Sequence, residues 1–175
     1  MTARRASRPS PAALAAWRRR AIRRMTRSRA ETLALVRGMP AAALRRSRTQ
    51  AAWSVRDVLV HIAAWEAEGA RRLALVARGR GDRIVWYDTP AELDAFNARV
   101  IRAGRRLDLQ GVLRRLAAAR ARLLRGLRRL PATALADPAH ALPVTRWLRE
   151  FAWTHEGEHR RKVRAWARTA AGGRP

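Results

Sequence analysis

The stretch Trp53–Glu66, WSVRDVLVHIAAWE, predicts the start and the buried face of an amphipathic helix. Ser54 is a favourable N-cap residue, and Asp57 three positions later completes a variant of the capping box. Apolar residues then recur at helical spacing as far as Trp65. The same stretch places a histidine, His61, at the edge of this apolar face, either as a core residue or as one ligand of a site.

Comparable helix signals occur along the rest of the chain, and no segment shows the sustained polar and apolar alternation of a strand. Ser10 followed by Pro11 predicts a helix start, and Gly38 with Pro40 predicts its end. Thr89-Pro90-Ala91-Glu92 combines a cap, a proline at the first helical position and a capping-box glutamate. We therefore expect helices over residues 11–37, 54–78, 89–103, 108–130 and 145–168.

Four long amphipathic helices and one short intervening helix predict an all-α fold, a four-helix bundle. The long connection between the helices at 54–78 and 108–130 predicts a crossover instead of simple up-and-down connectivity. A chain of 175 residues is long enough for one domain with its own core. We divide it into an Arg-rich N-terminal extension (1–27) continuing into the first helix, a bundle domain (28–168) and a flexible tail (169–175).

Composition excludes several classes of site. The chain has no cysteine, which rules out disulfides, thiolate zinc sites and cysteine nucleophiles. It also has no run of about 18 uncharged apolar residues, so we expect no membrane span and predict a cytoplasmic protein.

The formal net charge of +26 arises from 39 basic residues, of which only Lys162 is a lysine, against 13 acidic residues. A surface with this charge is expected to bind polyanions in a salt-dependent way. One alternative function is therefore that of a basic helical module that associates non-specifically with nucleic acid. The arginine runs are otherwise interpreted as solvated helix faces.

Three of the four histidines fall at informative positions. His155 and His159 are four residues apart in THEGEHRRK, and both continue an apolar stripe that includes Leu148 and Val163. We expect this pair to point into the bundle, where His61 of the earlier helix also points. His140 lies in a proline-flanked loop and is expected to be exposed.

Buried imidazoles need partners, and a divalent ion such as Zn, Ni or Fe satisfies neutral imidazole nitrogens directly. Two histidines four residues apart plus one from a facing helix give three ligands and an open position. We expect Glu66 or Glu158 to act as a base or to hydrogen-bond the ligands, and Trp65 and Asp57 to line the pocket. The alternative is that the histidines are core or rim residues hydrogen-bonded to carboxylates, with Trp65 serving only for packing.

Three segments, WSVRDVLVHIAAWE, LDAFNARVIRAGRRLDLQGVLRRL and WTHEGEHRRKVRAW, resemble the DinB/YfiT-like superfamily. Within it the chain is most similar to the ClbS/DfsB branch of four-helix-bundle proteins. The resemblance covers roughly residues 28–168. The pattern W-S-x-x-D-x-x-x-H-x-x-x-W-E and the late H-x-x-x-H are its specific parts.

The resemblance implies a divalent metal bound by His61, His155 and His159. It also implies a low-molecular-weight thiol as a co-substrate, because the superfamily includes transferases and isomerases that use mycothiol or bacillithiol, and it allows a homodimer. ClbS-like members protect the cell from reactive, DNA-damaging metabolites. We therefore expect hydrolysis or thiol conjugation of a small reactive electrophile, with a metal-free protein that binds and sequesters a small molecule as the alternative.

Overall fold

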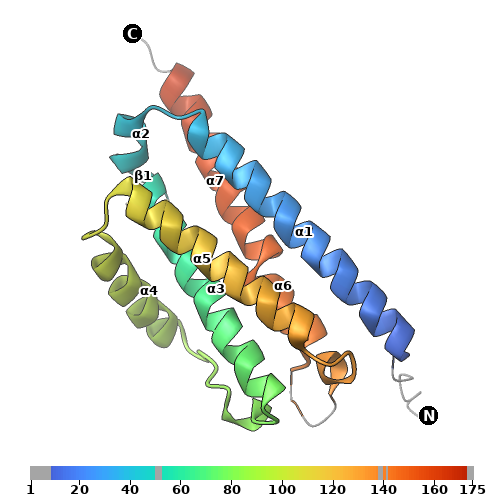
Figure 1. Cartoon of the computed structure of the whole chain (residues 1–175). Helices are drawn as coiled ribbons and strands as arrows, with labels where there is room; N and C mark the ends of the chain where they lie inside the picture. The colour runs from blue at the N-terminus through green and yellow to red at the C-terminus, as the bar shows by residue number, and fades with distance from the viewer. Residues whose placement is uncertain (1–8, 50–52, 138–139, 141, 173–175) are drawn as a thin grey trace, which may run out of the picture.

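The computed structural model describes residues 9–49, 53–137, 140 and 142–172. The ends of the predicted extension (1–8) and of the predicted tail (173–175) lie outside these residues. The elements are α1 (Pro11–Arg37), α2 (Ala41–Arg45), β1 (Ser47–Thr49), β2 (Trp53–Ser54), α3 (Val55–Ala77), η2 (Gly81–Arg83), α4 (Pro90–Gly104), α5 (Leu109–Arg129), η3 (Thr133–Ala136), α6 (Val144–Phe151) and α7 (Trp153–Gly172). The predicted all-α fold is confirmed (Figure 1). No helix in the described part of the chain combines the length and apolar character that a membrane span requires.

Four of the five predicted helix starts are confirmed by their caps. The side chains of Ser10, Ser54, Thr89 and Asp108 each accept a hydrogen bond from a backbone N–H in the first turn of their helix. At the start of α3, Asp57 N–H donates to Ser54 Oγ at 3.1 Å, and Asp57 Oδ2 accepts from Ser54 N–H at 3.1 Å. These reciprocal bonds satisfy backbone donors that a helix start otherwise leaves unpaired.

Three local features differ from the predicted pattern. The short helix α2 and the antiparallel pairing of β1 with β2 precede α3, where no regular structure was expected. The last predicted helix is divided into α6 and α7 at Ala152, whose φ of -126° and ψ of -103° are not helical. Finally, α7 continues to Gly172, so residues 169–172, predicted as tail, are helical.

The crossover between α3 and α5 is confirmed by the direction of the two helices. Residue numbers increase in the same direction along both helices, because Gly69 lies beside Leu123 and Leu73 lies beside Gly126. Helices α3 and α5 are therefore parallel and neighbouring, and α4 carries the chain back along the outside of the bundle (Figure 1). Gly104 at the end of α4 allows this return, because a Cβ there would lie 2.4 Å from a methyl group of Val60.

A buried ion-pair network joins the four long helices. Arg29 of α1 donates to Glu156 of α7 at 2.7 Å and to Glu66 of α3 at 2.8 Å. Arg120 of α5 donates to Glu156 at 2.6 Å and also pairs with Glu66. Both glutamates are 0% exposed and both arginines are under 10% exposed, so two positive and two negative charges cancel inside the bundle.

The network needs all four members because a buried charge without a partner is costly. Burial alone would raise the pKa of Glu156, but the charges of Arg29 and Arg120 outweigh burial and hold this pKa below its ordinary value. The arginines also bond the backbone, since Arg29 donates to the carbonyl of Leu116 at 2.9 Å and Arg120 donates to the carbonyl of Met25. Each helix thus depends on side chains of its neighbours.

Replacing Arg120 with Met should lower the free energy of unfolding by about 3–5 kcal/mol, because Glu66 and Glu156 would then share one arginine in a buried site. Urea unfolding at neutral pH measures this loss. Arg122→Met, two positions along the same helix and exposed, is the matched control and should change stability little. Equal losses in the two variants would contradict the role given to the network.

Candidate metal centre

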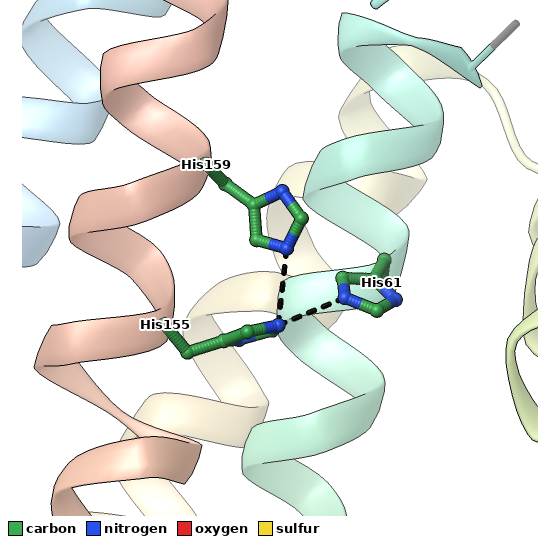
Figure 2. A group of neighbouring side chains, drawn as sticks. All are labelled: His61, His155 and His159. Carbon is green, nitrogen blue, oxygen red and sulfur yellow. Dashed lines mark hydrogen bonds between the residues drawn. The ribbon is translucent and has the colours of Figure 1, made fainter. Parts of the chain in front are cut away.

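Helices α3 and α7 bring three imidazoles together (Figure 2). His61 comes from α3, and His155 and His159 stand one turn apart on α7. The Nε2 atom of His155 lies 2.8 Å from Nε2 of His61 and 3.0 Å from Nε2 of His159. Within the described residues, these three side chains form a group whose ligand atoms all lie within 4.8 Å of one another.

The three rings differ in their access to solvent. His61 is 4% exposed and His159 is 5% exposed, whereas His155 is half-buried. The indole of Trp53 lies 4.8 Å from the His61 ring, measured between ring centroids, and covers that side. A small molecule would therefore approach the three nitrogens on the side of His155.

Hydrogen bonding among the rings leaves the centre incompletely satisfied. Nε2 of a neutral imidazole carries either one proton or one lone pair, so it either donates or accepts. Nε2 of His155 faces two other Nε2 atoms and cannot form a well-aligned hydrogen bond with both. A cation between the rings would satisfy all three lone pairs together.

The separations suit a metal site. Three nitrogens bound to one tetrahedral Zn²⁺ at about 2.0–2.1 Å lie about 3.3–3.4 Å apart. The two observed separations of 2.8 and 3.0 Å are a few tenths of an ångström shorter, and small side-chain rotations can make up this difference. The donor set and its spacing therefore fit a divalent ion that prefers imidazole.

The three rings are neutral at pH 7, which is the form that binds metals. Burial, together with the neighbouring His155 and His159, lowers the pKa of His61 to about 2. Burial likewise lowers the pKa of His155 to about 4, against the opposing charge of Glu156, and that of His159 to about 3. The Nδ1 atoms of all three rings are buried without a hydrogen-bond partner in the protein.

Trp65, predicted to line the pocket, is 8% exposed and lies beside the histidines. Its ring centroid is 6.2 Å from that of His61 and 6.3 Å from that of His155. Its indole N–H donates to Oδ1 of Asn97 on α4 at 3.1 Å. Asn97, which also lies close enough to raise the pKa of His61 slightly, was not singled out from the sequence, although it is the only asparagine in the chain.

The predicted carboxylates have other surroundings. Glu66 belongs to the ion-pair network with Arg29 and Arg120, and this pairing was not foreseen. Asp57 is 5% exposed and bonds Ser54 in the helix cap, while Glu158 is exposed on α7. In the part of the chain that the structure describes, no carboxylate joins the histidines as a candidate ligand.

His140 is half-buried, contrary to the prediction of an exposed side chain. Its ring packs on Gly81, where a Cβ would lie 2.1 Å from Nε2 of His140. Because η2 and the loop before α6 meet here, the glycine leaves room for the ring.

Arg72 is a second feature that sequence reasoning missed. It is 1% exposed, and its guanidinium carbon lies 4.4 Å from the ring centroids of both Trp86 and Phe151. Nη2 of Arg72 donates to the carbonyl of Val85 at 3.0 Å, which attaches the segment before α4 to α3. A pair of adjacent arginines on a helix, followed fourteen residues after Arg72 by a tryptophan, is too weak a signal to predict this contact.

Acid should destabilise the metal-free protein. Since the folded-state pKa values of the three histidines lie below their ordinary value of 6.5, the unfolded chain takes up protons below about pH 6.5 and the folded protein does not. The urea midpoint, measured with a chelator present, should therefore fall between pH 7.5 and pH 5. The double variant His61→Asn and His159→Asn should show a smaller fall, and an unchanged fall would contradict this origin.

A family model and a solved structure agree with this architecture, whereas no curated protein matches the sequence. A crystal structure of an uncharacterised protein from Escherichia coli UTI89 is similar in fold, with a TM-score of 0.74 over 88% of this chain and 94% of that chain at 13% sequence identity. The family model of the DinB superfamily matches residues 24–163. The match spans most of the sequence, and the chain therefore belongs to the DinB superfamily.

Proposed function

We propose that the protein binds one divalent metal ion through Nε2 of His61, His155 and His159, and that it acts there on a small reactive electrophile. The observation that carries the proposal is the meeting of three neutral, largely buried imidazole nitrogens at one place. Membership of the DinB superfamily supports the same conclusion. Zn²⁺, Ni²⁺ and Fe²⁺ all accept this set of ligands.

A bound ion of this kind supplies Lewis acidity and lowers the pKa of a water or thiol in its open position. The chain's own residues would hold and shield that position. His61 and His159 are fixed by burial, and His155 leaves one side accessible. Trp53 and Trp65 pack beside the His61 ring and would keep water away on that side.

The reaction class we propose is hydrolysis of the electrophile or its conjugation to a low-molecular-weight thiol, in a stress or self-protection role in the cytoplasm. We keep Glu158, expected from the sequence, as the proposed base; it is exposed on α7 and points about 100° away from His159 around the helix. Oε1 of Glu66 is bound by Arg29 and Arg120 inside the bundle, so its proposed contribution is to hold α3 and α7 in register.

The alternative function is metal-free binding and sequestration of a small molecule. One observation favours it, since the nitrogen separations of 2.8 and 3.0 Å also fall in the hydrogen-bond range. In that case the histidines would serve stability, and their replacement would lower the unfolding free energy without removing a bound metal.

Protein purified without a metal-affinity column should contain one metal ion per chain, detected by elemental mass spectrometry. Replacing His61, His155 or His159 singly with Ala should reduce this content severalfold, because a missing ligand weakens the site. His140→Ala is the matched control, as it removes a half-buried histidine away from the three rings, and should keep the metal.

Metal-free wild-type protein that remains metal-free after exposure to Zn²⁺, Ni²⁺ and Fe²⁺ would contradict the proposal and favour the sequestration function. Unchanged metal content in all three alanine variants would show that the ion binds elsewhere. Circular dichroism of each variant establishes that a reduced metal content does not simply reflect unfolding.

A further inference from the structure

Two helices carry a dense set of exposed arginines. On α1 they follow each other within residues 19–27, and on α5 within residues 122–129. Residues 1–30 and 109–136 contain no Asp or Glu that could neutralise them. We call the following set the arginine face: Arg19, Arg20, Arg23, Arg24 and Arg27 of α1 with Arg122, Arg125, Arg128 and Arg129 of α5.

The two helices that carry these arginines, α1 and α5, run antiparallel and are neighbours. Arg18 donates to the carbonyl of Leu130 at 2.7 Å, and Arg29 donates to the carbonyl of Leu116 at 2.9 Å. Residues 18–29 of α1 therefore lie alongside residues 116–130 of α5. Both helices lie on the near side of the bundle in Figure 1.

The arginines of both helices point away from the core. On α1 the buried positions recur at helical spacing through Ala21, Met25, Ser28 and Thr32, and the arginines of the face occupy the opposite side. On α5 the buried positions are Val112, Leu116, Ala119, Arg120, Leu123 and Leu127, again opposite the exposed arginines. On both helices the arginines therefore lie on the outer surface of the bundle, with no acidic side chain in these stretches.

A groove of about 480 Å³ between α3 and α5 borders this face. Arg71, Arg122, Arg125 and Arg129 stand around it, and most of its remaining lining consists of alanine and glycine, such as Ala70 and Gly126. Small side chains at its base let an extended ligand approach the guanidinium groups closely.

The chemistry of the face favours a polymer with regularly repeated phosphates. A guanidinium binds phosphate oxygens in a bidentate manner. Arg122, Arg125 and Arg129 are spaced about 4.5 and 6 Å along the axis of α5, so successive side chains can reach successive phosphates. No aromatic side chain is exposed on the described parts of α1 and α5, and the stacking platform that single-stranded nucleic acid requires is missing.

We propose that the arginine face binds the phosphate backbone of double-stranded nucleic acid without sequence preference. This binding goes beyond the proposed metal-dependent function and involves none of its residues. It would hold the protein close to the nucleic acid by interactions that neutralise phosphates and release their counterions.

The test measures binding of a short fluorescent DNA duplex by anisotropy at several salt concentrations. The quadruple variant Arg122→Gln, Arg125→Gln, Arg128→Gln and Arg129→Gln should bind at least about tenfold more weakly near physiological salt. The slope of log K against log salt should decrease by about 3–4 units, close to 0.9 for each phosphate that the protein no longer neutralises. Circular dichroism and metal content should remain unchanged.

The matched control removes the same charge elsewhere, by Arg99→Gln, Arg102→Gln, Arg105→Gln and Arg106→Gln, all exposed on α4 or just after it. Its affinity should fall much less. An equal fall in both variants would overturn the proposal, because net charge alone would then explain the binding. Tighter binding of single-stranded DNA, or competition by polyglutamate as effective as that of unlabelled duplex at equal charge, would also overturn it.

Discussion

The structure depends on the pairing of Arg29, Glu66, Arg120 and Glu156 inside the bundle. Each of the four long helical segments contributes one of these charges, and the two glutamates are fully buried. A packing of the same helices that separated them would leave charges unpaired away from water, at a cost of several kcal/mol each. Apolar periodicity alone would allow several arrangements of four amphipathic helices, and the network disfavours those in which its members do not meet.

The candidate metal centre follows from this constraint. Glu66 of α3 and Glu156 of α7 both bind Arg29 and Arg120, which brings α3 and α7 together. The same two helices carry the three histidines of the candidate metal centre. The network charges sum to zero, whereas the three imidazoles are kept neutral by burial and by one another. Two polar clusters therefore occupy one bundle interior for different reasons. In the first, the opposite charges pair within the protein, and in the second, three imidazole nitrogens lie together without an opposite charge among them.

In a chain with a net charge of +26, the positions of the few acidic residues decide where the positive charge is neutralised. Several of the 13 serve the structure directly, in the network, in the helix caps at Asp57, Glu92 and Asp108, and beside Arg72 through Glu68. The remaining acids all lie outside residues 1–30 and 109–136, so none lies in the arginine-bearing parts of α1 and α5. The net positive charge is thus distributed unevenly. Arginines inside the bundle are paired with glutamates, whereas those of the arginine face have no acidic residue in their own stretch of helix.

The sequence by itself determined the helices, their caps and the position of His155 and His159 one turn apart on the same face, because these depend on local spacing and hydrogen bonds within a few residues. The crossover was predictable from the length of the connection between two helices. The sequence also indicated that His61 would face that pair of histidines. Tertiary structure alone decided that Glu66 pairs with arginines, that Asn97 bonds Trp65, that His140 packs on Gly81 and that the last helix breaks at Ala152. These outcomes join residues as far apart as Arg29 and Glu156, 127 positions along the chain. Local patterns carry no signal for such pairs, since the packing of whole helices brings them together.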